Sequence, residues 1–272
     1  MTSPTLAGSV EPHAGLLQRP PAGQTLHKVM SVENLLASVE GGYLYFNRVD
    51  RYKDFPGADE NDGEQLPGDR SGNASVAFAT APNFTAADYY DRSRSRTYAF
   101  CAALDDTDHI WSYSAGTPRG NIGVAFDFDK LRATLNRTLQ PSGAIFDSNG
   151  IRCRQIFNLN YGIVEYVDWA DHRANETRLP NPIAYTYLKD RTLFAEEREL
   201  RISLSALGIG KFVLDDGSEM QFPEHLQFGF DFRAAFADGT IRSLTAGPRC
   251  DQDFLRSELY RLRVGLAPAD PP

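Results

Sequence analysis

Cysteine is scarce in this sequence, and its few cysteines lie far apart. The 272 residues include three, Cys101, Cys153 and Cys250, and no Cys-x-x-Cys pair. An odd, scattered set of thiols argues against both a disulfide framework and a zinc site. A reducing compartment is the simplest setting for such a chain, so we expect a cytoplasmic protein.

Long apolar runs and an excess of positive charge are also missing. No apolar stretch approaches the about 20 residues that a membrane helix needs, so we expect no membrane span. The N-terminus lacks a basic start followed by an apolar run, so we expect no signal peptide. With a formal net charge of −8, the chain lacks the electrostatic footprint of a general duplex nucleic-acid binder.

The composition that remains is that of a globular protein. Hydrophobic residues make up 42% and charged residues 24%, which is enough for a sizeable core. The 17 phenylalanines and 12 tyrosines favour strands. We predict an α+β fold with mixed, mostly antiparallel sheets and short helices. We expect residues 1–23 to be a disordered tail, 24–264 a single globular domain and 265–272 a C-terminal tail.

The first structured unit has the order strand, helix, glycine stop, strand. Residues 26–30 read as a strand, Ser31 can cap a helix over 32–40, and Gly41-Gly42 can end it before a strand at 43–46. This order resembles the entry unit of an ADP-ribosyltransferase fold. The resemblance implies that His27 or Lys28, on the first strand, touches the nicotinamide ribose of NAD. An exposed or hydrogen-bonded strand histidine is the other interpretation of His27.

A long acidic segment follows, from Asp50 to Arg70. A loop of this length inside a domain is usually functional or disordered. Residues 59–64 vaguely resemble a calcium loop, but their spacing fails the required pattern of acidic positions. We therefore predict no metal site.

Trp111-Ser112-Tyr113 stands before a turn and a strong strand pattern at 122–128. The two aromatic rings offer faces on which a planar ring can stack, and the Ser112 hydroxyl can bond a ribose or backbone group. Core packing of Trp111 and a turn role for Ser112 explain the same residues equally well.

A second acidic cluster runs directly into an alternating strand pattern. Leu200, Ile202 and Leu204 point one way, and Arg201 points the other. If the strand begins by Glu197, the carboxylates of Glu197 and Glu199 share one face beside Arg201. Such carboxylates raise each other's pKa, and the guanidinium lowers it. The pair suits binding a sugar hydroxyl, stabilising a developing cation or holding a metal, and it also fits a solvated strand face.

Several of these segments, in this order, resemble a bacterial family known as domain of unknown function 2971. The segments that carry the resemblance are Arg51-Tyr52-Lys53-Asp54, Trp111-Ser112-Tyr113-Ser114-Ala115, Arg119-Gly120, and Lys189 and Phe194 before Glu197-x-Glu199-x-Arg201. Phe55-Pro56-Gly57 and Ser114 depart from the pattern of the family. The resemblance spans residues 26–262.

The motif order of that family is similar to that of ADP-ribosyltransferases, which implies a function. In this interpretation Glu199 binds the ribose of NAD and stabilises an oxocarbenium-like state, and Glu197 serves the acceptor. His27, Lys28 and Ser112 position the ribose and amide, and Trp111 or Tyr113 stacks on nicotinamide. Arg201 is also placed among the residues that contact NAD. The expected enzyme is an ADP-ribosyltransferase or NAD glycohydrolase whose acceptor, a protein, nucleic acid or small molecule, is unknown.

Two other functions remain open. A metal-dependent nuclease or phosphoryl-transfer enzyme would bring Asp54 or the 59–64 carboxylates within a few ångströms of Glu197 and Glu199. A non-enzymatic sensor or interaction domain would use Glu197, Glu199 and Arg201 as an ion-pair network on a strand.

Overall fold

The computed structural model describes residues 10, 17–54, 57–112, 117–139, 145–155, 157–173, 183–207 and 210–264. The fold is α+β, with mostly antiparallel sheets and short helices, as predicted. Nine of the described strands form one sheet. They are β1 (Thr25–Ser31), β2 (Tyr43–Arg48), β5 (Thr97–Ala103), β6 (Asn121–Asp127), β7 (Ile145–Phe146), β8 (Phe157–Ile163), β11 (Glu199–Ala206), β14 (His225–Gly229) and β15 (Ile241–Ala246).

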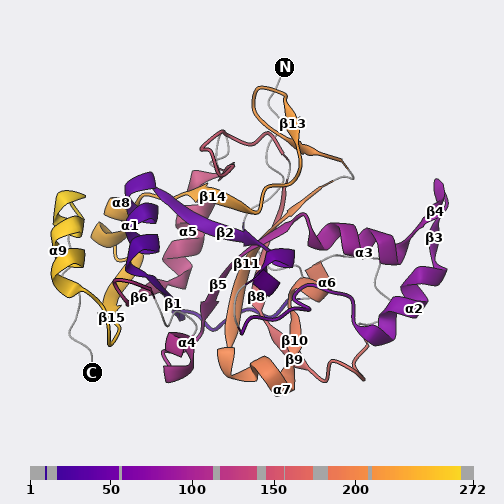
Figure 1. The fold of residues 1–272 in the computed structure, drawn as a ribbon, viewed down its shortest axis with the longest axis horizontal. Helices are drawn as coiled ribbons and strands as arrows, with labels where there is room; N and C mark the ends of the chain where they lie inside the picture. The colour runs from indigo at the N-terminus through magenta and orange to yellow at the C-terminus, as the bar shows by residue number, and fades with distance from the viewer. Residues whose placement is uncertain are drawn as a thin grey trace.

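This sheet forks at β5. One edge of β5 pairs with β1 at Ala103 and with β2 at Ala99, while the other edge pairs with β11 along its whole length. Strands β6 and β15 extend the β1 branch, β14 and β7 extend the β2 branch, and β8 lies beyond β11. Figure 1 shows the two branches diverging on the left of β5 and β11.

The main core fills the space between the branches. Phe46 of β2 lies 5.9 Å from Phe100 of β5 and 5.7 Å from Phe228 of β14, and Phe100 lies 6.0 Å from Phe126 of β6, between ring centroids. Alternation of large apolar residues along each strand places these rings on one face. The other face of β5 carries only small side chains, which becomes important at the site.

The helices are short. They are α1 (Val32–Gly41), α2 (Pro67–Ser75), α3 (Ala86–Arg94), α4 (Asp108–Ser112), α5 (Phe128–Thr138), α6 (Ile183–Thr186), α7 (Arg191–Phe194), α8 (Phe232–Ala237) and α9 (Gln252–Arg261), with 3-10 helices η1 (Val49–Asp54) and η2 (Ala195–Glu197). The predicted caps of α1 are confirmed: Ser31 Oγ accepts from Asn34 N, and Gly42 ends the helix in the left-handed conformation with φ 66°.

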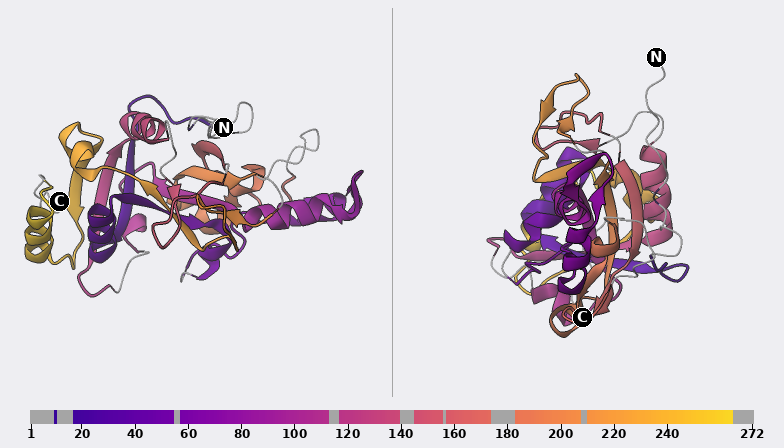
Figure 2. Two further views of the ribbon diagram at one scale, coloured as in Figure 1. Left: turned by 90° about the horizontal axis from the view of Figure 1, so that it is seen from above. Right: turned by 90° about the vertical axis from the view of Figure 1, so that its right-hand side faces the viewer.

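An arm extends from the sheet on the side opposite α1 and α9 (Figures 1 and 2). It consists of α2, α3 and the hairpin β3 (Ala77–Phe78) and β4 (Ala81–Thr85). Its base packs on α6 and on the parallel pair β9 (Glu165–Val167) and β10 (Leu188–Asp190) through a second small core. A third small hairpin joins β12 (Phe212–Val213) and β13 (Glu219–Met220). The acidic segment 57–66 therefore runs from the sheet to the arm.

Part of the N-terminal segment belongs to the fold. Val10 is fully buried in the main core, and its N–H donates to Asn136 Oδ1 at 2.7 Å. Gln18 forms a bridge with Ile163 of β8. For these residues the prediction of a disordered tail over 1–23 is wrong, because one apolar side chain reaches the core. Residues 1–9, 11–16 and 265–272 lie outside the described residues.

Truncation of this buried side chain tests whether it anchors the segment. Val10→Ala removes two buried methyl groups, so we expect the free energy of unfolding to fall by about 1–2 kcal/mol in urea titrations. Val76→Ala is the matched control, because Val76 is 55% exposed. Equal stability of the two variants would mean that Val10 does not anchor the chain.

Candidate functional site

Two glutamates flank a strained residue at the start of β11. Glu197 ends η2, Arg198 is left-handed with φ 43°, and the strand begins at Glu199. The prediction that both glutamates share one strand face is wrong, because the strand starts two residues later. They still meet: Lys189 Nζ of β10 lies 2.5 Å from Glu197 Oε2 and 3.1 Å from Glu199 Oε2.

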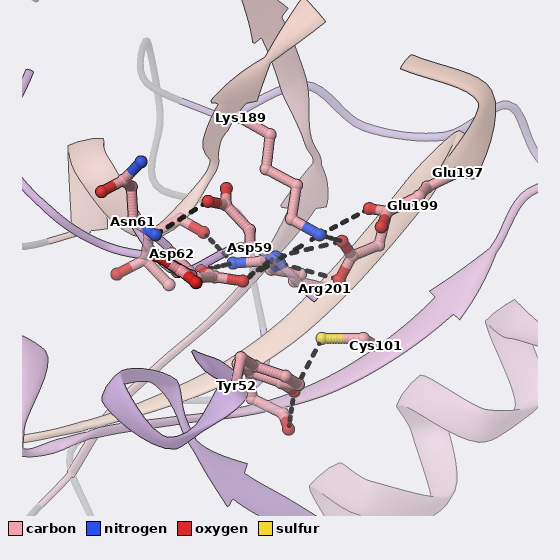
Figure 3. A network of polar contacts seen from close by, with 12 residues as sticks. Tyr52, Asp59, Asn61, Asp62, Cys101, Lys189, Glu197, Glu199 and Arg201 are labelled. Carbon is pink, nitrogen blue, oxygen red and sulfur yellow. Dashed lines mark hydrogen bonds and ion pairs between the residues drawn. The ribbon is translucent and has the colours of Figure 1, made fainter. Parts of the chain in front are cut away.

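Every N–H of the Arg201 guanidinium donates to an oxygen of the protein (Figure 3). Nε and Nη2 donate to the Glu199 carboxylate at 2.8 and 3.0 Å, and Nη1 and Nη2 to the Asp62 carboxylate at 2.5 and 2.7 Å. The second Nη1 proton goes to the Thr186 carbonyl at 2.7 Å. Arg201 is fully buried and has no donor left for a phosphate or a ribose. This corrects the expectation that Arg201 contacts NAD.

The acidic segment supplies the second carboxylate of this network. Asp62 is 1% exposed. Its backbone carbonyl accepts from Arg94 Nε of α3 at 2.6 Å, and Nη1 of the same guanidinium lies 2.5 Å from Glu64 Oε1. The segment that the sequence marks as either functional or disordered is therefore fixed against the site by the arm. Residues 55 and 56 lie outside the described residues.

The opposite charges in the cluster hold each other ionised. Burial alone would raise the pKa of Glu199, but Arg201 and Lys189 lower it below its ordinary value. Burial alone would lower the pKa of Lys189, but Glu199 and Asp62 raise it above its ordinary value. Both groups are consequently charged at neutral pH.

Asp59 is the exception in this cluster. Its Oδ1 accepts from Asn61 N at 2.8 Å, while its buried Oδ2 accepts no hydrogen bond from the described residues. Burial, followed by the charge of Asp62, raises the pKa of Asp59 to about 6. This carboxyl group therefore titrates close to neutral pH.

Small and neutral groups of β5 lie beneath the cluster. Cys101, directly opposite Arg201 in the strand register, has its Sγ 2.9 Å from the Tyr52 hydroxyl. Burial, followed by the charge of Glu199, raises the pKa of the Cys101 thiol to about 12. The thiol stays neutral and packs under the guanidinium, so the site offers no thiolate here.

His27 and Glu199 lie in one row across the sheet. Both residues are register partners of Ala103, one through β1 and the other through β11, so all three side chains point to one face. His27 is partly exposed, and burial lowers its pKa. Lys28 lies on the opposite face, with Nζ 5.2 Å from the centroid of the Phe100 ring. Only His27 of the two predicted first-strand residues can therefore share a site with Glu199.

Trp111 lies on the same face, in the short helix α4. Its ring covers Gly123 of β6 and Gly247, and its Nε1 donates to Asp106 Oδ1 at 3.2 Å. Gly123 is the register partner of Val29, two residues along from His27, which places the indole on the face of His27. A cavity of about 110 Å³ lies beside the ring, lined by Trp111, Asn121, Pro248 and Arg249.

Ser112, the second residue of the Trp-Ser-Tyr motif, does not bond to the cluster. The Ser112 hydroxyl donates to the His109 carbonyl at 2.7 Å, which is a local helical bond. Tyr113 lies outside the described residues. A link between the motif and the cluster comes instead from His109, whose Nδ1 lies 3.4 Å from Glu196 Oε2 at the edge of η2.

The carboxylates that a metal-dependent enzyme would need do come together, but around a guanidinium. Asp62 and Glu199 use both oxygens of each carboxylate to bind Arg201. Within the described ranges no group of three His, Cys, Asp or Glu side chains is arranged to hold a metal ion. This geometry does not favour the phosphoryl-transfer alternative.

The sequence alone assigns no individual role to two members of the cluster, Lys189 and Asp62. Lys189 appears in the family resemblance without a role, and Asp62 appears as one of seven acidic residues in a long segment. The one sequence signal for Asp62 is the glycine after it: Gly63 is left-handed with φ 71°, which fixes a tight turn directly beside the buried carboxylate.

No family model, curated protein or solved structure matches this chain. Among the described residues, no helix is both long and apolar enough to cross a membrane.

The raised pKa of Asp59 predicts a pH-dependent stability. A carboxyl group whose pKa is raised on folding stabilises the fold fully below the unfolded pKa of 3.8, and this contribution is lost as the pH rises through about 6. The free energy of unfolding of Asp59→Asn, measured relative to wild type in urea titrations, should therefore rise by up to about 3 kcal/mol between pH 4 and pH 7.5. Asp253→Asn is the control, because the Asp253 side chain is 98% exposed. Parallel pH curves for wild type and Asp59→Asn would contradict the raised pKa.

Proposed function

We propose that this chain is an NAD-dependent ADP-ribosyltransferase-like enzyme. It cleaves the bond between nicotinamide and ribose and transfers ADP-ribose to an acceptor. The single observation that carries the proposal is the row His27–Ala103–Glu199 on one sheet face, with Glu199 held ionised by Arg201 and Lys189. The forked antiparallel sheet is compatible with the fold that the resemblance implies.

The chemistry needs a fixed negative charge at the ribose. When the glycosidic C–N bond breaks, its electron pair leaves with nicotinamide and positive charge develops on the ribose ring. A carboxylate that is already ionised and oriented stabilises this charge without reorganising. The bidentate contact with Arg201 and the contact with Lys189 hold Glu199 in that state.

In the proposed reaction Glu197 serves the acceptor. The acceptor forms a bond to the anomeric carbon and loses a proton, which a nearby carboxylate can accept. Glu197 is more exposed than Glu199, with 12% of its side chain accessible against 7%. It contacts the same ammonium group of Lys189, so the two carboxylates act side by side.

His27 lies on the far side of Ala103 from Glu199. Two strand spacings place the α-carbons of His27 and Glu199 about 10 Å apart. The side chain of Ala103, between them, is a single methyl group. In the proposed enzyme the nicotinamide ribose lies over this row, between the imidazole and the carboxylate.

A non-enzymatic sensor or interaction domain is the second candidate. It is favoured by the burial of Glu199 and by the ion pairs that occupy both of its oxygens. In this case the network holds the acidic segment and β11 together and has no chemical role.

The two candidates differ in what happens when one carboxylate of Arg201 is neutralised. Glu199→Gln and Asp62→Asn each remove one bidentate partner of Arg201, so we expect similar losses of melting temperature. Glu199→Gln should lower the rate of nicotinamide release from NAD by at least about 100-fold. Asp62→Asn should keep most of its activity, because in the proposed reaction Asp62 contacts Arg201 and neither the ribose nor the acceptor.

Nicotinamide release by purified protein, with melting curves of each variant, checks this prediction. Glu196→Gln is the exposed control, since 84% of the Glu196 side chain is accessible. If wild type releases no nicotinamide and NAD does not shift its melting temperature, the sensor or interaction domain is the better description. Activity losses that follow the melting temperatures of both variants would also contradict a chemical role of Glu199.

A further inference from the structure

A small cavity lies at the other end of the same sheet face. The cavity beside Trp111 is bounded by the indole, by Asn121 of β6, and by Pro248 and Arg249 after β15. The indole packs on two glycines, because a Cβ at Gly123 or Gly247 would approach the ring within 2.8 or 3.0 Å. Two glycines and the bond to Asp106 thus hold the ring against the sheet beside the cavity.

The cavity has hydrogen-bond donors to offer. Asn121 Oδ1 accepts from Thr117 Oγ1 at 3.2 Å, and its Nδ2 donates to none of the described residues. Arg249 is exposed, and over the described part of the chain its guanidinium has no ion-pair or hydrogen-bond partner. Its neighbour Arg119 is different, since it pairs with Asp251 at 2.8 Å and lies 3.5 Å from the Phe254 ring centroid.

These groups match one part of a nucleotide. An indole ring stacks on a planar base, an amide N–H donates to a ring nitrogen, and an unpaired guanidinium binds a phosphate. A cavity of about 110 Å³ is well below the roughly 300–1,000 Å³ of a site for a whole drug-sized ligand. It is therefore suited to one ring and not to a complete dinucleotide.

Strand spacing decides which ring of NAD the cavity can take. Three steps, from β6 through β1 and β5 to β11, separate Gly123 under Trp111 from β11 by about 14 Å. Nicotinamide is bonded directly to the ribose that Glu199 would touch, so it cannot reach Trp111. The adenine ring lies beyond the two phosphates of NAD and can reach Trp111. In this arrangement Trp111 stacks on adenine, whereas from the sequence we expected Trp111 or Tyr113 to stack on nicotinamide.

We propose that the cavity formed by Trp111, Asn121 and Arg249 binds the adenine nucleotide half of NAD, with Arg249 on a phosphate. This inference rests on the proposed function for its placement of nicotinamide. The binding site itself makes a separate claim, because a nucleoside diphosphate without nicotinamide should occupy it.

Fluorescence of Trp111 reports on this site. The chain has two tryptophans, so Trp169→Phe leaves Trp111 as the single reporter. Titration with ADP should change its emission in a saturable way, whereas nicotinamide mononucleotide should not. Arg249→Ala in the same background should weaken ADP binding about 10-fold, as expected for loss of one charge-assisted hydrogen bond. Arg256→Ala, an exposed arginine of α9, is the matched control.

Calorimetric titration of otherwise wild-type protein with ADP, with and without Arg249→Ala, repeats the test without the reporter substitution. Absence of ADP binding, or equal ADP affinity of Arg249→Ala and Arg256→Ala, would overturn the proposal. A response to nicotinamide mononucleotide and not to ADP would also overturn it. ADP binding without nicotinamide release would leave this site standing while the proposed function fails. If the protein releases nicotinamide and Arg249→Ala leaves the KM for NAD unchanged, the proposed function stands and the proposal for this cavity fails.

Discussion

The guanidinium of Arg201, between the carboxylates of Asp62 and Glu199, joins the parts of the chain that form the site. It connects the acidic segment, strand β11 and the carbonyl that ends α6 through five hydrogen bonds. A buried ion pair stabilises little by itself, because taking charges out of water costs several kcal/mol per ion. Removing one partner is much more harmful, at about 3–5 kcal/mol, because the other charge then stays buried and unpaired. The network therefore fixes one arrangement of these segments and penalises others.

The shape of β5 makes room for this network. Tyr98, Phe100 and Ala102 face the core, while Ala99, Cys101 and Ala103 face the cluster. The small side chains let the guanidinium and the Tyr52 ring lie close to the strand, with the guanidinium carbon 5.9 Å from the ring centroid. The cluster holds more carboxylates than cations, and this excess keeps Lys189 protonated. Burial, followed by the charge of Asp62, raises the pKa of Asp59. Perturbed ionisation and the left-handed Arg198 gather in one place, as they do at many functional sites.

Local features of the fold could be predicted from the sequence, because a few neighbouring residues determine them. The alternation at 200–204 gives a strand with its apolar face inward, and Ser31 and Gly42 bound the first helix. The pairing of Arg201 with Asp62 could not be predicted, because 139 residues separate them and no periodicity connects them. The start of β11 was misplaced because Arg198 adopts a conformation that bulky residues rarely take. The short helix that carries Trp111 could not be predicted, because a single helical turn leaves too short a pattern to recognise.

A crystal structure of the protein with a non-cleavable carbocyclic analogue of NAD is the most direct test of the central claim. The account predicts that the ring in place of the nicotinamide ribose lies over Ala103, within hydrogen-bond distance of the Glu199 carboxylate. It also predicts that Arg201 keeps both of its carboxylate partners. An analogue bound on another surface, or an intact cluster that excludes it from this face, would contradict the account and leave the ion-pair network with a structural role alone.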